Sequence, residues 1–332
     1  MKKNILIAII VICSLFSLYF YSLSKIKEDT IYFISGYHKS LFGSDGHGFF
    51  NLATIIEKSG YKVIETNSFK NLKNAKYFVV FDIHKSKFRK IKRLPQKKLI
   101  LFVWEPPTTI KENHDKSFYR YFSKIFTFND ALIDNKKLFK FYYPDAKKMI
   151  EDTPSFENKK FCTQITSDKS SDHPCELYTE RRNAIKYFEE FAPSDFDLYG
   201  IGWKKEEFSS YKGSIPDKIK TLSEYKFAIC YENSKDVKGY ISEKIFDCFH
   251  TGTIPIYLGA DNITDYIPDN CFIDKRKFKS YNELYVYLKT MSEDDYQTYL
   301  DNINLFLKSE KAKLFTGDNL IETFKKALEL EK

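Results

Sequence analysis

The sequence predicts an α/β protein built from open parallel sheets. Short runs rich in β-forming residues alternate with amphipathic helical segments along most of the chain, which is the pattern of repeated strand–helix–strand units. One unit, residues 225–259, is complete in itself and reads strand, polar loop, helix and returning strand. The length of 332 residues and the apolar fraction of 43% suit two domains with packed cores.

The N-terminal segment has the properties of a membrane anchor. Residues 5–23 are apolar and uncharged, and the run is long enough to cross a bilayer. Lys2 and Lys3 precede it, which favours a cytoplasmic amino end, although two lysines beyond the run oppose this orientation. A cleaved signal peptide is the alternative, but no small-x-small cleavage site is evident. We therefore predict that residues 1–27 form an uncleaved anchor and a short stem.

Residues 28–155 are predicted to form a first Rossmann-like domain. A helix is expected at residues 49–58, after a glycine-rich loop. Turn-forming residues separate several short apolar runs, which is typical of strands in an open sheet. The predicted strands are 30–35, 61–66, 75–83, 98–104, 125–129 and 139–143.

Glu105 is the candidate catalytic residue of this domain. It follows the predicted strand at residues 98–104 and precedes Pro106 and Pro107. A proline disfavours helical geometry in the residue before it, and parallel sheets bind ligands at the carboxyl ends of their strands. The position therefore suits a general base, and the alternative is a surface glutamate in a turn.

Residues 156–332 are predicted to form a second Rossmann-like domain. It opens with a strand at residues 160–166 and a helix at residues 176–191. Arg181 and Arg182 lie in the first half of that helix. If the helix presents one of them to the crevice, its guanidinium can hold a phosphate bidentately. The alternative is a solvated basic face.

Asp195 and Asp197 form a D-x-D pattern of the kind that binds metal ions. We discount it, because the pair enters a strand, whereas ligands bind where strands end. No other part of the sequence has the spacing of metal ligands. The remaining predicted elements are helices at 217–225, 281–290, 293–308 and 319–330 and strands at 227–231 and 253–258.

The strongest ligand signal lies between the last two of these strands. Asn233 stands in the polar turn after the first strand, and Tyr240, Glu243 and Lys244 lie at the start of the following helix. Free N–H groups and the helix dipole favour an anion there, and Lys244 adds a full charge. Ser242 is expected to cap this helix through its hydroxyl. A phosphate or diphosphate site is predicted, with an ordinary βαβ unit as the alternative.

The composition narrows the possible partners. A net charge of +8 is compatible with an anionic small ligand or an anionic membrane surface. Nucleic acid is disfavoured, because no zinc, homeodomain or RNA-recognition signature is present. The six cysteines include no C-x-x-C pair, and Cys162 and Cys175 are either free thiols or a disulfide.

Several segments resemble the family 10 glycosyltransferases, which are α-1,3/1,4-fucosyltransferases. Most of residues 95–310 take part in the resemblance. The segments that carry it are YKFAICYENS…GYISEKIFDCFHTGTIPIYLGA, VWEPP, ERRNAI, LYGIGW and CFIDKRKFKSYNELYVYL. Two residues depart from the family pattern, since Ser242 stands where Thr is usual and Leu258 where Trp is common.

The resemblance implies a GT-B architecture in which an acceptor-binding and a GDP-fucose-binding domain face one cleft. It also implies inverting transfer of L-fucose to an N-acetylglucosamine-type or glucose residue of a glycan, without a metal or other cofactor. Glu105 then matches the base, and the donor site comprises Arg182, Asn233, Tyr240, Glu243 and Lys244.

The resemblance and the predicted anchor together imply a single-pass type II membrane protein, Golgi-like if eukaryotic and in the inner membrane if bacterial. Two alternatives remain open. One is a transferase for a different nucleotide-sugar donor, and the other is a non-catalytic, membrane-anchored glycan-binding protein.

Overall fold

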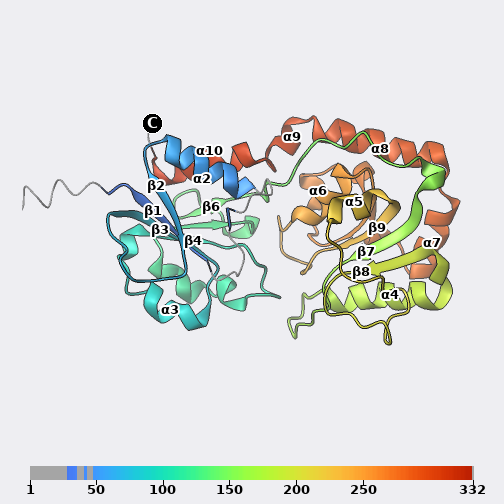
Figure 1. Cartoon of the computed structure of the whole chain (residues 1–332), viewed down its shortest axis with the longest axis horizontal. Coiled ribbons are helices and arrows are strands. Elements are labelled where there is room, and N and C mark those ends of the chain that lie inside the picture. The colour runs from blue at the N-terminus through green and yellow to red at the C-terminus, as the bar shows by residue number, and fades with distance from the viewer. Residues whose placement is uncertain (1–27, 36–40, 43–47, 331–332) are drawn as a thin grey trace, which may run out of the picture.

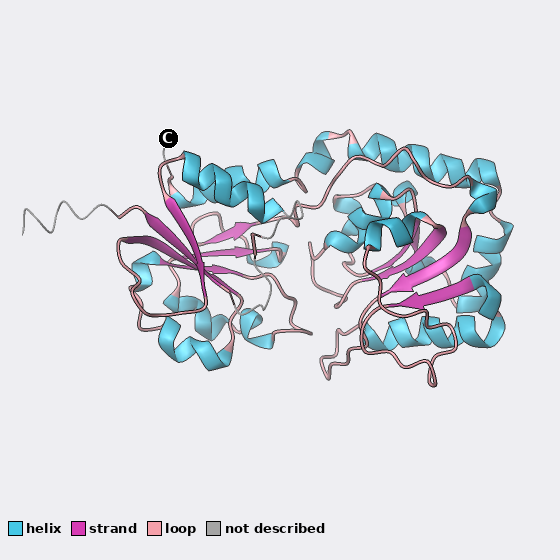
Figure 2. Cartoon of the chain, in the orientation of Figure 1, coloured by secondary structure: helices cyan, strands magenta, loops and turns pink. Residues whose placement is uncertain are grey.

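The computed structural model describes residues 28–35, 41–42 and 48–330. This part of the chain contains two parallel β-sheets, and helices lie on both sides of each sheet. The two sheet units stand side by side along the longest axis of the molecule (Figures 1 and 2). The predicted α/β fold with parallel sheets is therefore confirmed.

The first sheet has six strands, one for each predicted run. They are β1 Thr30–Ile34, β2 Lys62–Thr66, β3 Ala75–Phe81, β4 Leu99–Phe102, β5 Lys124–Thr127 and β6 Leu138–Lys140. Their order is β2-β1-β3-β4-β5-β6, with all neighbours parallel. Helices α2 Gly48–Lys58 and α3 Lys85–Ile91 lie on its two sides (Figure 1). Ile31, Val79 and Leu101 are fully buried, since both faces of the sheet are covered.

The second sheet has five parallel strands. They are β7 Lys160–Ile165, β8 Phe196–Tyr199, β9 Tyr225–Tyr231, β10 Ile254–Leu258 and β11 Ile273–Asp274. Their order is β11-β10-β9-β7-β8. The helices are α4 Tyr178–Phe191, α5 Lys218–Ser223, α6 Glu243–His250, α7 Tyr281–Thr290, α8 Glu293–Leu307 and α9 Glu310–Lys313. Helices α4 and α7 contribute to the core on one face, and α5, α6 and α9 to the core on the other.

The last helix, α10 Gly317–Leu328, returns to the first sheet (Figure 1). Phe324 of α10 stacks on Phe33 and Phe126, with ring centroids 6.1 and 5.3 Å apart. The prediction that residues 156–332 form one unit is therefore wrong for α10. The apolar stripe of this helix completes the covering of the first sheet, which that sheet's own short helices leave open.

Hydrogen bonds join the two units at the mouth of the cleft between them. The Asp130 backbone N–H donates to the Lys238 carbonyl at 3.1 Å, and the Asp130 carboxylate accepts the Asn262 amide at 3.0 Å. A second contact, 3.2 Å long, links the hydroxyls of Thr109 and Tyr178. Both links lie near the carboxyl edges of the sheets, where Asp130 follows β5 and Tyr178 begins α4, so direct contacts hold the two sides of the cleft together.

The predicted anchor, residues 1–27, lies outside the described residues. Among the helices that the structure does describe, none is both long and apolar enough to span a bilayer. The anchor therefore stays a prediction from sequence.

Candidate functional site

Residues from both sheet units line a cavity of ≈ 260 Å³ between them. The first unit contributes the segments that follow β4 and β6, and the second contributes the turn after β9 and the start of α6. These are carboxyl ends of parallel strands, where α/β proteins place their ligands. The lining residues are Trp104, Glu105, Tyr143, Asp145, Asn233, Tyr240, Glu243 and Lys244.

The structure thus brings together five of the six residues that the sequence assigns to the site. Glu105 comes from the first unit, and the other four come from one stretch of the second. Arg182 is the exception, since it is not among the lining residues. Asp145 is new, and a signal for it existed: like Glu105, it follows a predicted strand and lies beside a proline.

Glu105 is held in place by a buried polar cluster. The Asp82 carboxylate accepts the backbone N–H of Trp104 at 2.7 Å and that of Glu105 at 3.1 Å. The Asn113 amide donates to the same carboxylate at 2.5 Å and to the Glu105 carbonyl at 3.2 Å. Burial, reinforced by the Asp82 charge, raises the pKa of Glu105. A carboxylate with a raised pKa binds a proton more readily, as a general base must.

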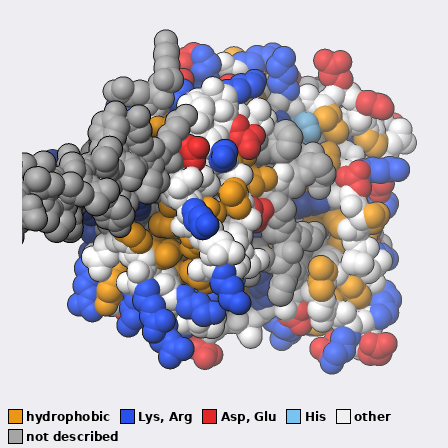
Figure 3. All heavy atoms as spheres, turned by 60° about the vertical axis from the view of Figure 1, so that its left-hand side comes forward, with side chains coloured by type: hydrophobic (Ala, Val, Ile, Leu, Met, Phe, Trp, Pro, Cys, Tyr) orange, Lys and Arg blue, Asp and Glu red, His pale blue; other side chains and the backbone are white. Residues whose placement is uncertain are grey.

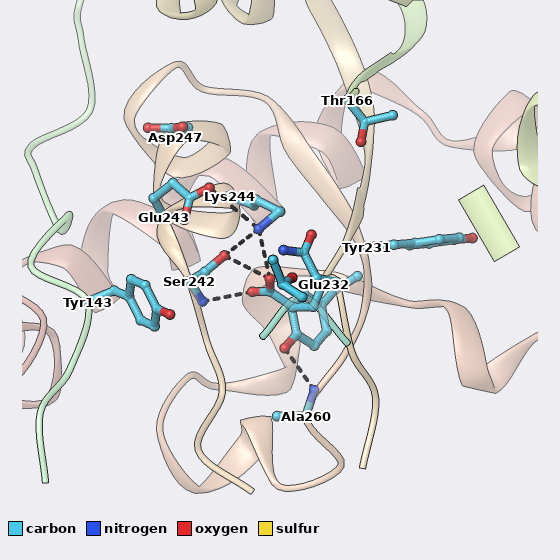
Figure 4. A network of polar contacts seen from close by, with 12 residues as sticks. Tyr143, Thr166, Tyr231, Glu232, Ser242, Glu243, Lys244, Asp247 and Ala260 are labelled. Atoms are coloured by element: carbon cyan, nitrogen blue, oxygen red, sulfur yellow. Dashed lines mark hydrogen bonds and ion pairs between the residues drawn. The ribbon is translucent and has the colours of Figure 1, made fainter. Parts of the chain in front are cut away.

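Glu232, at the end of β9, organises the start of α6 (Figure 4). Its side chain is fully buried and accepts both the backbone N–H and the hydroxyl of Ser242 at 2.7 Å. The Lys244 ammonium donates to Glu232 at 3.1 Å and to the Ser242 hydroxyl at 2.8 Å. Ser242 occupies the N-cap position, but its hydroxyl makes no cap hydrogen bond. The predicted capping role is wrong, because Glu232 and Lys244 take up the hydroxyl instead.

Gly259 is needed where the chain turns beside this network. A Cβ at this position would lie 2.4 Å from the Tyr257 hydroxyl and 2.6 Å from Cγ of Glu232. Both neighbours are fully buried, so neither can move away without cost. The glycine therefore allows the close approach that seats Glu232 beneath α6.

Opposite charges fix the ionisation of the first turn of α6. Burial alone would raise the pKa of Glu243, but Lys244 and Lys218 outweigh it and lower that pKa to about 2. Burial would likewise lower the pKa of Lys244, yet Glu232 and Glu243 raise it. Lys244 is therefore a permanent cation at the N-terminus of a helix, an arrangement that attracts an anion.

Arg181 and Arg182 point to different surroundings. Arg181 is 5% exposed and donates to the Tyr231 carbonyl at 2.6 Å and to Oδ1 of Asn233 at 2.9 Å. Arg181 and Lys244 share the lining of a small cavity of ≈ 30 Å³, and Lys244 also lines the main cavity. Arg182 instead forms an ion pair with Asp168. Of the two arginines, Arg181 is the one that lies next to Asn233 and Lys244.

Comparison with known proteins shows which family the donor-side half of the site resembles. Residues 155–311 match the family model described as glycosyltransferase family 10 (fucosyltransferase), C-terminal part. The resemblance to family 10 is confirmed for these residues. The family 10 region thus contains β7 to α8, including the whole turn from Glu232 to Lys244.

Individual relatives agree with the family match. An α-(1,4)-fucosyltransferase of Arabidopsis thaliana is 41% identical over 73 residues, which is 22% of this chain and 18% of the relative. A 4-galactosyl-N-acetylglucosaminide 3-α-L-fucosyltransferase of Mus musculus is 34% identical over 122 residues, 36% of this chain and 32% of the relative. The matched segments therefore span less than a third of either relative.

A solved structure resembles the fold of the whole chain. The crystal structure of an α1,3-fucosyltransferase with GDP aligns with a TM-score of 0.54 and 15% identity. The alignment covers 90% of this chain and 90% of that one. The likeness extends the shared fold beyond the family 10 region to both sheet units.

The D-x-D pair of the family 10 region lies away from the cavity. Asp195 accepts hydrogen bonds from the Tyr285 hydroxyl at 2.6 Å and from Lys289 at 2.9 Å. Asp197 lies at the start of β8 and accepts the Tyr225 hydroxyl at 2.6 Å. In the described ranges no group of three His, Cys, Asp or Glu side chains is arranged to hold a metal ion.

Asp145 is a buried carboxyl that faces the cavity. Its Oδ2 atom is buried without a hydrogen-bond partner in the described part of the chain. Burial, together with the charges of Glu243 and Asp247, raises the pKa of Asp145 to about 7. An ordinary aspartate in an unfolded chain titrates near ~4. Between pH ~4 and pH 7, Asp145 therefore holds a proton in the folded protein, whereas the same carboxyl is already ionised in the unfolded chain.

This difference predicts a pH-dependent stability effect. The protonated Asp145 stabilises the folded state fully below the pKa that it has in the unfolded chain. This contribution to the free energy of unfolding is lost as pH rises through the folded-state pKa of about 7. We expect Asp145→Asn to raise the free energy of unfolding at pH 8 by about 1–4 kcal/mol, and by much less at pH 4. Urea unfolding of both proteins at the two pH values measures this. Equal differences at pH 4 and pH 8 would contradict the prediction.

Proposed function

We propose that the chain is an inverting fucosyltransferase. It moves L-fucose from GDP-fucose to a hydroxyl of an N-acetylglucosamine-type or glucose residue in a glycan, in α-1,3 or α-1,4 linkage. One observation carries the proposal: a proton-accepting carboxylate from one sheet unit faces an anion-attracting helix start from the other across a single cavity. The names of the relatives point to the same reaction.

The donor lies on the second unit in this proposal. The diphosphate of GDP-fucose is placed at the N-terminus of α6, where Lys244 and the free N–H groups of the first turn supply positive charge. The same charge stabilises GDP as it departs, so no metal ion is needed for that purpose. Asn233, Tyr240 and Glu243 are proposed to contact the sugar and ribose hydroxyls from the cavity wall.

Glu105 supports the acceptor side of the reaction. Its carboxylate takes the proton from the acceptor hydroxyl while that oxygen forms a bond to the anomeric carbon of fucose. The bond from the anomeric carbon to the β-phosphate oxygen breaks at the same time, and GDP leaves with the electron pair. One base is sufficient for such an inverting displacement, since no glycosyl-enzyme intermediate forms.

The two neighbouring arginines provide a test of the donor site. We expect Arg181→Lys to weaken GDP binding by about tenfold or more, because the guanidinium that holds both Asn233 and the Tyr231 carbonyl is lost. Arg182→Lys is the matched control on the next residue and should change GDP affinity by less than about threefold. Isothermal titration with GDP measures both. A larger effect at Arg182 would favour the assignment that the family resemblance implies.

A donor and acceptor panel tests the function itself. The full chain should release GDP from GDP-fucose when N-acetyllactosamine, a type 1 chain or chitobiose is present. The rate should be unchanged in excess chelator, because Lys244 and the helix N-terminus carry the charge. Complete loss that manganese restores would contradict metal independence. If the nucleotide is released only from another nucleotide sugar, the chain is a transferase for a different donor. If the chain binds glycans without releasing any nucleotide, it is a non-catalytic glycan-binding protein.

We also propose the finer arrangement that the sequence implies. The two sheet units form a GT-B pair with the acceptor on the first, and residues 1–27 anchor the protein as a single-pass type II membrane protein. The structure describes the chain from residue 28 onward, so the anchor is supported by the uncharged apolar run of the sequence alone. Protease protection of the full chain in sealed vesicles measures its topology.

A further inference from the structure

One end of the first sheet unit carries a strong positive charge. Residues 70–98 contain eleven Lys and Arg residues and a single acidic residue, Asp82, which is 1% exposed. The net charge of the whole chain is +8, so the rest of the chain is close to neutral. Eight of these cations are exposed, namely Lys70, Lys73, Lys85, Arg89, Lys90, Lys92, Arg93 and Lys97. Among the described residues, the one ion pair formed by these eight exposed cations is that of Lys85 with Glu112, at 2.9 Å.

Part of this charge adjoins a hollow at the amino ends of β1, β3 and β4, whereas Lys85 follows the carboxyl end of β3 and pairs with Glu112. The hollow has a volume of ≈ 450 Å³, and its apolar lining includes Phe69, Leu72 and Leu94. Lys70 and Lys73 stand beside the lining residues on one rim, and Arg93 and Lys97 do so on the other. We call this surface the basic end. Figure 3 turns this side of the molecule forward and shows Lys and Arg side chains grouped around hydrophobic ones.

The basic end lies opposite the cavity. The strands of the first sheet are all parallel, and Glu105 follows the carboxyl end of β4 while Lys97 precedes its amino end. A surface bound at the basic end therefore leaves the cleft open to solvent. The cations here are too far from the start of α6 to act on the diphosphate, so an anionic partner of theirs is a different one.

The chain also enters the first sheet at this end. Glu28 lines the hollow and pairs with Lys98 at 2.6 Å, two residues before β1 begins. The predicted membrane segment ends at about residue 23. An extended chain covers at most ~3.5 Å per residue, so five residues place Glu28 within about 20 Å of the bilayer surface. This placement rests on the proposed anchor: with residues 1–27 in a bilayer, the partner of the basic end is located next to the membrane.

We propose that the basic end binds the anionic headgroups of a phospholipid bilayer and holds the cleft pointing away from it. Cations attract anionic lipids within a Debye length of the surface, and apolar side chains between them can enter the headgroup region. The cations flank a hollow whose apolar lining is partly aliphatic, with Leu72 and Leu94 beside Phe69. This pattern favours a lipid surface over a nucleic-acid strand.

The test uses the full chain reconstituted in nanodiscs of phosphatidylcholine, either alone or mixed with phosphatidylglycerol. A water-soluble amine-reactive reagent labels exposed lysines, and mass spectrometry quantifies each site. We expect labelling of Lys70, Lys73 and Lys97 to fall about threefold or more on the anionic discs. Lys279 and Lys308, on the second unit, should be labelled equally on both. Equal labelling of all five on both discs would overturn the proposal.

Charge-reversal variants provide the matched comparison. The basic-end variant is Lys73→Glu/Arg93→Glu/Lys97→Glu, and the control is Lys220→Glu/Lys279→Glu/Lys308→Glu, with the same charge change on the second unit. Only the first should lose the protection of Lys70 on anionic discs. Protection that persists in the basic-end variant would overturn the proposal. The proposal would also be overturned if a DNA oligonucleotide, added to the wild-type protein in detergent, protected Lys70 from labelling more strongly than anionic lipid does.

Neither variant touches the cavity, so transfer to a soluble acceptor in detergent should match wild type in both. This readout separates the two proposals. If the basic-end variant loses lipid protection but still transfers fucose, the charge at the basic end is needed for lipid binding and not for catalysis. If no protein transfers fucose, wild type included, the proposed function is wrong and the lipid result is unaffected. Thermal unfolding of both variants shows whether the fold is kept.

Discussion

Glu105→Gln is expected to reduce fucosyl transfer by about 10²–10⁴-fold, the range that a positioned general base contributes. The amide retains the size of the side chain, and the backbone contacts to Asp82 and Asn113 remain. However, it cannot accept the acceptor proton. GDP-fucose affinity should stay within about threefold, because the donor contacts come from the other unit. Single-turnover rates and titration calorimetry measure the two quantities separately.

Glu112 provides the control for this experiment. It lies on the same connection after β4, but pairs with Lys85 and does not line the cavity. Glu112→Gln should therefore leave transfer near the wild-type rate. If Glu105→Gln also transfers at near the wild-type rate, another group accepts the proton, and Asp145 is the candidate because its carboxyl lines the same cavity and its pKa is raised to about 7.

Lys244→Ala is expected to weaken GDP binding by about 10–100-fold, since it removes the permanent cation at the N-terminus of α6. The substitution also removes the ion-pair partner of the fully buried Glu232. A buried carboxylate without its cation destabilises a protein by about 3–5 kcal/mol. Loss of binding in the single variant therefore has two possible causes, which must be separated.

The double variant Lys244→Ala/Glu232→Gln separates them. Glutamine at position 232 keeps an acceptor for the Ser242 N–H but carries no charge, so the fold should be recovered. We expect its thermal unfolding temperature to lie closer to wild type than that of Lys244→Ala, while GDP binding stays weak. Recovery of GDP affinity along with stability would show that Lys244 acts only through the fold and does not hold the diphosphate.

The sequence predicts most strands of this protein, because its parallel sheets require local apolar runs bounded by turn residues. β1 and β9 show this well: each is a short, nearly uniform run of apolar β-formers that is buried on both faces. Glu105 and Lys244 are predictable for a related reason. Their roles depend on position at a strand or helix end, which adjacent residues specify.

What the sequence does not predict depends on contacts between distant segments. The helix α10 has an ordinary amphipathic pattern, and nothing local indicates which sheet it covers. Arg181 and Arg182 are adjacent and chemically identical, so only the packing of α4 decides which one reaches Asn233. Ser242 has the sequence of an N-cap, but the buried Glu232, ten residues earlier, takes its hydroxyl.

The return of α10 also sets an order for folding during synthesis. Residues 155–311, the family 10 region, emerge from the ribosome with all strands of the second sheet present. The first sheet emerges earlier but lacks Phe324, which packs on Phe33 and Phe126. Because α10 follows the whole second unit in the chain, the first sheet is completed only after that unit has been synthesised. Nascent domains usually fold in the order of their synthesis, whereas here the first sheet is completed last, and Phe33 and Phe126 lack their contact with Phe324 until then.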